Sequence, residues 1–454
     1  MDGEEQREFE RMIESPIRPL ILRLAVPAII SMTVTGVYNT ADTYFVSQLG
    51  TSASAAVGVI FSLMAMIQAI GFTLGTGAAS VISRSLGARD LERANRYASS
   101  SVAAAFILGC LTSLIGYQFV VPICRALGAT ATVLPYAAEY AAVILLGALL
   151  MTCACVLNTG LRAEGKAKFA MAGLASGGVL NIFLDPLFIF TFGLGIRGAA
   201  IATVLSQAVS LAIMASWYRR GRSVVRHRLS LVSKSFGTYL EVIELGSPSF
   251  CRQGLASLGL VMLNIEAAIW GDAALSAVSI AKKIIMMAFM VGVGIGQGYQ
   301  PVVGYNYGAG RWGRVRDAFL FVTEATFFSL VVLCSLIFLG APSIMRWFIH
   351  DPQVVSIGTE ALRWQSAALP LLALNLSVSM TCQSVGQSWN ALALAVCRSG
   401  LFFIPLVLTL PRFFGLTGLV AVQAVSDVCS AFISVPAMIA FLRGVRRRSE
   451  EAAL

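Results

Sequence analysis

"LGTGAAS" at residues 74–80 and "IGQGYQP" at 295–301 align when the chain is laid over itself with a shift of 221 residues. The same shift aligns "LAVP" at 24–27 with "LGSP" at 245–248. Glycine frees the backbone and proline restricts it, so their joint recurrence is more than a by-product of apolar composition. We predict that the chain consists of two structural repeats.

The composition around these segments is that of a membrane protein. Hydrophobic residues make up 57% of the 454 positions and charged residues only 12%, against about 25% charged residues in soluble domains. Apolar stretches of about 20 residues recur along the chain, long enough to cross a hydrocarbon core about 30 Å thick as helices. Strand-like alternation is absent, which excludes a membrane barrel. The predicted spans are 20–48, 54–82, 97–121, 136–161, 169–192, 197–218, 242–270, 274–302, 318–342, 356–388, 389–410 and 417–441.

These spans define the fold class. We predict an all-α polytopic membrane protein of twelve transmembrane helices, arranged as two six-helix lobes related by the internal repeat. An even number of spans gives both lobes the same topology, and substrate is then expected between them. The predicted parts are an N-terminal tail at 1–19, an N-lobe at 20–218, a linker at 219–241, a C-lobe at 242–442 and a basic C-terminal tail at 443–454.

Charge predicts the orientation. Lys and Arg gather in every second connection, as in "SRSLGARDLERANR" and "RRGRSVVRHR", while the opposite connections hold about one each or none. By the positive-inside rule, both termini and the linker are cytoplasmic. The net charge of +10 is therefore mainly a topology signal. No aromatic residues interleave the basic runs, so the lipid bilayer is the expected partner and a nucleic acid is not.

Cysteine and histidine give no sign of an enzyme. The nine cysteines form no CxxC pair, and both histidines, His227 and His350, fall in connections. An intramembrane enzyme that uses a histidine base or a metal centre is therefore disfavoured, and we predict neither enzymatic activity nor a resident cofactor. A chain with two lobes can form a cavity alone, so a monomer is expected.

Asp185 interrupts the apolar stretch "GGVLNIFLDPLFIF" at 177–190. A charged side chain at the centre of a span costs roughly 2.5–3.5 kcal/mol, so this residue needs partners or a proton. Asn181 lies one helical turn earlier and can hydrogen-bond to it. Pro186 lacks an N–H, which leaves the carbonyl of Ile182 without its helical donor. Together these groups predict an oxygen-rich site that suits a hard cation or a proton.

Asp42 supplies a second interior acid. In "YNTAD", Tyr38 and Asn39 lie on the same helical face as Asp42. Two acids in one lobe, removed from water and close together, would favour a proton on at least one of them near neutral pH. A proton carrier needs such a group.

The order of "VYNTADTYFVSQLG", "GTGAASVISRSLGARD", "NIFLDPLFIFTFGLGIRGAAIAT" and "GIGQGYQPVVGYNYGAG" resembles the bacterial multidrug and toxic-compound extrusion (MATE) family. The resemblance covers residues 20–442, and its most specific part is the Asp-Pro stretch with the glycines that follow. It implies a multi-pass antiporter of the bacterial cytoplasmic (inner) membrane. Such a protein exports small organic compounds, often cationic, in exchange for protons or sodium.

The resemblance also implies a set of coupling residues in the N-lobe. The positions that match the family's cation or proton site are Asp42, Asn158, Asn181, Asp185 and Thr203. A sodium ion would be held by Asp42, Asn181 and Asp185. The alternative is that Asn158 only caps a helix end and that Thr203 only hydrogen-bonds to its own helix.

The C-lobe does not repeat these acids. Under the shift, Asp42 aligns with Leu263, and "LDPL" meets the apolar "FIPL" at 403–406. Glu266 is a candidate for a second site, or else for a structural pair with Lys282 or Lys283. For Asp427 the sequence suggests no role.

A second class of function stays open. A lipid-linked precursor flippase of a related superfamily would share the fold, but it should show a cationic cavity, and interior arginines look scarce in this sequence. The residues do not decide between proton and sodium coupling, since both ions accept carboxylate oxygens. They do not name the substrate either.

Overall fold

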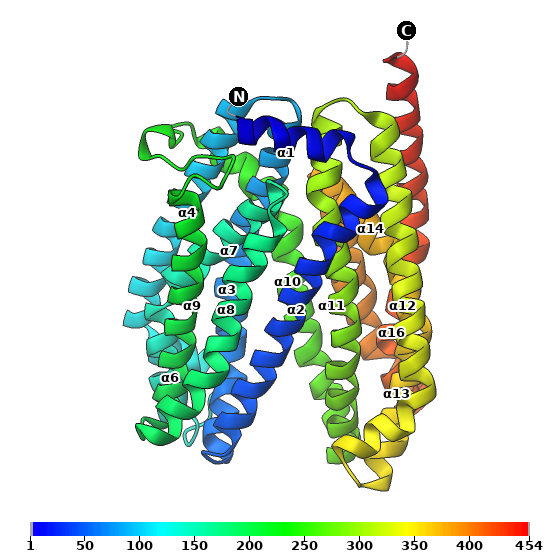
Figure 1. Cartoon of the computed structure of the whole chain (residues 1–454). Helices are drawn as coiled ribbons and strands as arrows, with labels where there is room; N and C mark the ends of the chain where they lie inside the picture. The colour runs from blue at the N-terminus through cyan, green and yellow to red at the C-terminus, as the bar shows by residue number, and fades with distance from the viewer. Residues whose placement is uncertain (1–2, 453–454) are drawn as a thin grey trace. The chain divides into compact units, whose positions relative to one another are not determined.

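The computed structural model describes residues 3–452, which are helical almost throughout and contain no strand (Figure 1). The helices of the first half are α1 (Gly3–Glu14), α2 (Ile17–Ser47), α3 (Thr51–Gly87), α4 (Leu91–Gln118), α5 (Val120–Ala126), α6 (Leu134–Leu146), α7 (Ala148–Ala163), α8 (Ala167–Pro186), η1 (Leu187–Thr191) and α9 (Gly195–Arg219). Those of the second half are η2 (Leu229–Leu231), α10 (Phe236–Ile269), α11 (Asp272–Gly308), α12 (Trp312–Phe348), α13 (Pro352–Ala368), η3 (Leu369–Leu371), α14 (Leu372–Val385), α15 (Ser388–Val396), η4 (Cys397–Phe402) and α16 (Phe403–Glu451).

Twelve membrane spans follow from these helices within residues 3–452. Nine helical segments are long and apolar enough to cross a bilayer, and α6 with α7 forms a tenth span bent by 50°. The longest segment, Ser388–Glu451, contains two spans, because Gly415 breaks it with φ 62° and ψ −141°. α10 has 34 residues and four charged side chains, which lower its hydropathy but not its reach. The predicted class of twelve helices in two lobes is confirmed.

The chain divides into two compact units. Unit 1 comprises residues 1–14 and Ile30–Phe250, and unit 2 comprises Ser15–Ile29 and Cys251–Leu454. The predicted lobes, 20–218 and 242–442, follow the repeat in the sequence, whereas these units follow the packing. The difference concerns only α2 and α10, since each of these helices begins in one unit and ends in the other.

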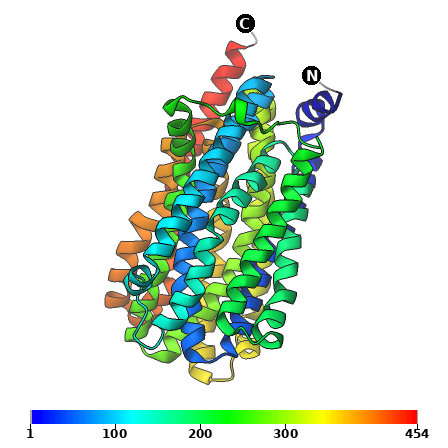
Figure 2. The ribbon, with the colours of Figure 1, turned by 90° about the vertical axis from the view of Figure 1, so that its left-hand side faces the viewer.

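Unit 1 is held together by apolar residues on facing helices. α3 packs on α4 and α7, and α9 packs on α6, α7 and α8 (Figure 2). The bend between α6 and α7 lies beside Gly147, where an added Cβ would meet the Val204 side chain at 2.5 Å. The close approach of α9 at this point therefore requires a glycine. One core cluster of this unit includes Ile60, Ile67, Tyr140, Ile144 and Met151, all buried.

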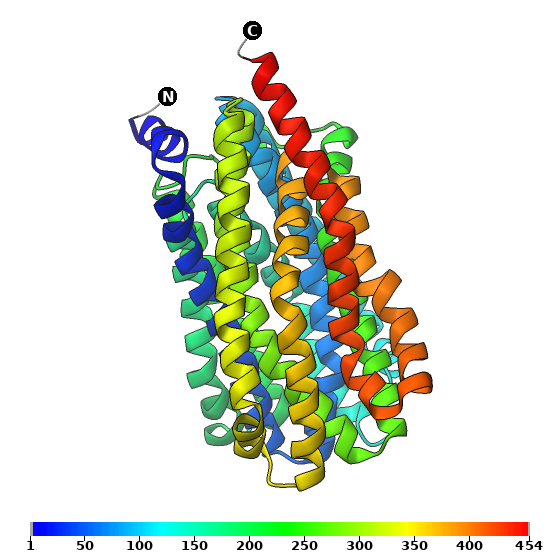
Figure 3. The same cartoon turned by 90° about the vertical axis from the view of Figure 1, so that its right-hand side faces the viewer.

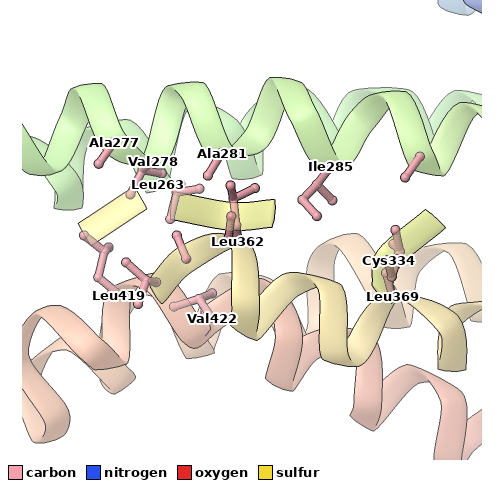
Figure 4. Close-up of a cluster of buried hydrophobic side chains, with 14 of the residues drawn as sticks. Leu263, Ala277, Val278, Ala281, Ile285, Cys334, Leu362, Leu369, Leu419 and Val422 are labelled. Carbon is pink, nitrogen blue, oxygen red and sulfur yellow. The ribbon is translucent and has the colours of Figure 1, made fainter. Parts of the chain in front are cut away.

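Unit 2 has a corresponding core. α14 packs against α11, α12 and α16, as the view onto α12, α14 and α16 shows (Figure 3). Its buried side chains come from α10, α11, α12, α13 and α16, with Leu263, Ala281, Ile285, Leu362 and Leu419 among them (Figure 4). Small residues on α11 alternate with larger ones on its neighbours, so the helices interlock without large voids.

Two close helix crossings are related by the repeat. In unit 1, a Cβ added to Gly77 of α3 would lie 1.9 Å from the Val242 carbonyl oxygen of α10, and one added to Gly246 would lie 1.9 Å from the Thr73 oxygen. In unit 2, a Cβ on Gly298 of α11 would meet the Ala25 backbone nitrogen of α2 at 2.4 Å. Gly298 is Gly77 shifted by 221 residues, and Gly246 is Ala25 shifted by 221. The second helix of each repeat thus packs on the first helix of the other repeat.

The predicted linker is folded onto unit 1. Val224 and Val225 are buried. The Glu164 carboxylate accepts hydrogen bonds from Ser223 Oγ at 2.7 and 2.8 Å and from the Val224 N–H at 2.8 Å. Lys166 Nζ donates to the Arg222 carbonyl oxygen. This loop is therefore a packed part of unit 1 rather than a free tether.

Candidate functional site

Asp185 lies at the end of α8 and is completely buried. Asn181, one turn earlier and 2% exposed, donates from Nδ2 to Asp185 Oδ1 at 3.1 Å. The amide–carboxylate contact expected from their spacing is thus present. It leaves Asp185 Oδ2 and Asn181 Oδ1 buried without a hydrogen-bond partner.

Further unpartnered oxygens gather beside these two. Ser206 Oγ and Ser210 Oγ of α9 are also buried without a partner. Both serines and Asn181 line a cavity of about 10 Å³ together with Tyr38 and Thr203, a space close to that of one water molecule. Buried polar atoms without partners are rare in folded proteins, so a cluster of them around a small space points to a bound ligand.

Asp42 joins this cluster from α2. Its side chain is half-buried, and its Oδ1 is buried without a hydrogen-bond partner. Asp42 lies close enough to Asp185, Tyr38 and Tyr140 for their charges to interact. Two carboxylates that share a site shielded from water cannot both stay charged without a compensating cation.

A glycine pair brings the three helices together. A Cβ added to Gly178 of α8 would meet the Tyr38 and Val34 side chains of α2 at 2.9 Å. A Cβ added to Gly177 would meet the Ser210 side chain of α9 at 2.9 Å. Adjacent glycines on opposite sides of α8 therefore let both neighbours approach, which closes the cavity around Asn181.

The helix changes its winding directly after the carboxylate. Pro186 is the last residue of α8, and the π-helical segment η1 follows at once. Proline cannot donate to the carbonyl four residues earlier, so the regular ladder fails here. The sequence predicted a freed carbonyl at Ile182 but not the π-helix, and such segments often occur at functional sites.

Sequence reasoning missed two members of the site. Ser206 and Ser210 follow Thr203 at helical spacing, so all three lie on one face of α9. This pattern was visible in "ATVLSQAVS", but serines on an apolar helix usually hydrogen-bond to their own backbone. Tyr140 of α6, whose hydroxyl faces Thr203, was also missed.

Asn158 is engaged elsewhere. Its Nδ2 donates to the Ala170 carbonyl oxygen at 3.0 Å and contacts Met214 Sδ at 3.9 Å. This amide ties α7 to α8 and α9, and within residues 3–452 no hydrogen bond joins it to Asp42 or Asp185. Asn39 is half-buried, and its side chain takes part in no hydrogen bond of that same range.

The assembled oxygens fit a hard monovalent cation or a proton. Carboxylate, amide and hydroxyl oxygens are ligands for such ions, and soft ligands are absent from the cavity lining. No group of three histidine, cysteine or acidic side chains gathers anywhere in residues 3–452, so a transition-metal centre has no ligand set there. A sodium ion at this point would be held by Asp42, Asn181 and Asp185, with Ser206 and Ser210 in reach.

The C-lobe holds a different polar cluster. Arg398 Nε donates to Asp427 Oδ1 at 3.0 Å, Gln423 Nε2 donates to the same oxygen at 3.0 Å, and Lys282 Nζ donates to Gln423 Oε1 at 2.8 Å. The predicted alternative of a pair between Glu266 and Lys282 or Lys283 is wrong, because Lys282 contacts Gln423 instead. The expectation that interior arginines are scarce is also wrong here, since Arg398 lies in the middle of the span predicted at 389–410.

Fold and site together define a multi-pass membrane protein with a buried, carboxylate-based cation site in one of two repeats. Comparison with known proteins identifies the class further. The MatE family model matches residues 27–187 and 248–409, one segment in each repeat. The chain belongs to the MatE family.

Its relatives are transporters. The chain is 25% identical over 423 residues to the multidrug export protein MepA of Staphylococcus haemolyticus, which covers 93% of each chain. It is 26% identical over 421 residues to MepA of Staphylococcus aureus, covering 92% of each. A crystal structure of MATE in complex with MaL6 superposes with a TM-score of 0.92 at 28% identity, covering 97% of this chain and 99% of that one.

Proposed function

We propose that this protein is a secondary active antiporter that exports organic, mainly cationic, drugs or toxic compounds in exchange for protons or sodium. Two lines support the export of such compounds: family membership and the names of the MepA relatives. The coupling carboxylates are Asp42 and Asp185 of the N-lobe. Both chain ends are cytoplasmic, as the distribution of Lys and Arg indicates, and the protein works as a monomer in the bacterial cytoplasmic membrane.

One observation carries the coupling role. Asp185 is completely buried, and one of its oxygens has no hydrogen-bond partner although Asn181 holds the other. A carboxylate in this position is strongly favoured when a cation or a proton compensates it. Loading and release of that cation therefore change the free energy of the surrounding helices by several kcal/mol, enough to bias a two-state equilibrium.

The helices around the site are suited to respond. An ion that neutralises Asp42 and Asp185 removes the repulsion between α2 and α8, and these helices touch at Gly178. The π-helical turn of η1 lies directly beyond Pro186, so the end of α8 can rewind without breaking a regular ladder. Rewinding there would change the packing of α8 on α9, which is the conformational step that export requires.

Transport in everted membrane vesicles tests the proposal. We expect Asp42→Asn and Asp185→Asn to reduce uptake of a fluorescent cationic dye to near background while the protein is still inserted. Glu139→Gln is the matched control, because Glu139 of α6 is an exposed carboxylate. Full dye transport by a well-expressed Asp185→Asn protein would refute the coupling role.

The driving ion is determined in the same vesicles. An imposed pH gradient without sodium should drive uptake if protons couple, and a sodium gradient at equal pH should do so if sodium couples. Uptake driven by neither gradient would exclude the antiport mechanism. The alternative function, a lipid-linked precursor flippase, predicts no dye transport under any gradient, so the same assay separates the two classes.

A further inference from the structure

The polar cluster of the C-lobe has an excess of positive charge. Arg398 of η4 and Lys282 of α11 are joined to the single carboxylate of Asp427, directly in one case and through Gln423 in the other. Arg252 of α10 lies close enough to Arg398 for the two guanidinium charges to repel. Three cations thus share one buried carboxylate.

This excess cannot be explained as a structural ion pair. One pair, Arg398 with Asp427, would be neutral, with side chains 17% and 3% exposed. Lys282 and Arg252 add two further positive charges inside spans, where each charge is costly. An uncompensated buried charge usually destabilises a protein by several kcal/mol, so such a cluster is retained when an anion occupies it during function.

The cluster also has unused hydrogen-bond donors. Arg398 donates to Asp427 through Nε alone, and its two terminal nitrogens join no hydrogen bond in residues 3–452. Lys282 uses one of its three donors, on Gln423. Both cations also lie over aromatic rings, Arg398 at 4.8 Å from the Phe289 centroid and Lys282 at 6.0 Å from that of Phe403. A flat apolar ring system beside an acidic group would find complementary surfaces here.

The geometry points to a binding subsite for the carboxylate of an aromatic organic anion or zwitterion, formed by Arg398, Lys282 and Arg252. The inference rests on the proposed export function only in that this ligand is a substrate. The N-lobe site attracts cations and the C-lobe cluster attracts acids, so the two repeats differ in polarity. Asp427 holds Arg398 in place when the subsite has no ligand, and the incoming carboxylate competes with it.

A matched pair of dyes tests this assignment. Rhodamine B carries a free carboxylate, and its ethyl ester has the same chromophore without that charge. Binding of each to the purified full-length protein in detergent, measured by fluorescence polarisation without an ion gradient, reports on the site independently of transport. We expect the wild-type protein to bind rhodamine B about tenfold more tightly than the ester, a difference of about 1.4 kcal/mol.

Two variants of the ion pair give opposite results. Asp427→Asn removes the competing carboxylate and should increase the preference for rhodamine B several-fold. The double variant Arg398→Gln with Asp427→Asn removes the pair without leaving a lone buried charge, and should abolish the preference. Lys283→Gln is the control, since the neighbouring Lys283 is exposed and belongs to no part of the cluster. A purely structural pair would not produce a gain in binding in Asp427→Asn.

Equal binding of the two dyes by the wild-type protein, or an unchanged preference in the double variant, would overturn the assignment. Asp185→Asn should keep the preference even where it abolishes export, because it lies in the other repeat. A protein that binds rhodamine B selectively but exports nothing would retain this subsite and refute the proposed function instead.

Discussion

Single residues determine what the N-lobe site can hold. Asp42, Asn181 and Asp185 were found in the sequence because polar residues inside apolar spans are conspicuous. Ser206, Ser210 and Tyr140 were not found, since hydroxyl groups are common in helices and usually bond to their own backbone. Only their burial without partners, in the case of the two serines, shows that they face the cavity.

The hydroxyl of Ser206 provides a test at this scale. It is buried without a partner, which costs roughly 1–3 kcal/mol in the empty site. Ser206→Ala should therefore stabilise the ion-free protein slightly and raise the ion concentration for half-maximal transport several-fold. Ser216→Ala is the control on the same helix, because Ser216 Oγ already donates to the Ile213 carbonyl oxygen. An unchanged ion dependence in Ser206→Ala would remove this hydroxyl from the site.

At the scale of whole elements, the sequence predicted the spans well and their irregularities poorly. Hydropathy locates apolar helices within a few residues because the bilayer requires a fixed length. The π-helical segments η1 and η4 were not predicted, although Pro186 indicated a local break. Winding depends on packing against neighbours. Arg398 was overlooked for a related reason, since its partner Asp427 lies in the following span and only folding brings them together.

The packed linker gives a pH-dependent prediction. Burial raises the pKa of Glu164 from 4.5 to about 7, although hydrogen bonds from Ser223 and Val224 lower it in part. The folded protein therefore keeps a proton that the unfolded chain loses between pH 4.5 and about 7. The stability contributed by that proton is fully present below pH 4.5 and is lost as the pH rises through about 7.

We expect the melting temperature of the wild-type protein to fall relative to that of Glu164→Gln as the pH rises from about 5 to about 8. The full effect corresponds to about 3 kcal/mol, or a few degrees. Differential scanning fluorimetry of both proteins across this range measures it. Parallel melting curves at every pH would show that Glu164 does not titrate in the folded linker.

At the scale of the molecule, the repeat was the most reliable signal in the sequence. The shift of 221 residues relates Gly77 to Gly298, and both glycines lie at close crossings where a Cβ would strike a backbone atom. The sequence could not show what each glycine contacts, because alignment of the halves says nothing about exchange between them. Only the packing reveals that each repeat uses the other repeat's first helix.

The crossing of α3 and α10 should therefore tolerate no side chain. Gly246→Ala places a Cβ 1.9 Å from the Thr73 carbonyl oxygen, and the helices must separate to relieve the clash. We expect a loss of several degrees in melting temperature or loss of folded protein on size-exclusion chromatography. Gly254→Ala on the same helix meets nothing within 4 Å and should melt at or above the wild-type temperature. Equal stability of the two variants would contradict the crossing.

The division of α2 also has a consequence for biosynthesis. Ser15–Ile29 is among the first segments to leave the ribosome, yet it belongs to a unit whose other residues, Cys251–Leu454, are translated last. During elongation this segment has none of its own packing partners, and Ala25 waits for Gly298 of α11. A chain that stalls within its second half thus displays an unmatched helix at its beginning, which membrane proteases or insertion chaperones could read as the mark of an unfinished product. Completion of the last helices and protection of the first are a single event.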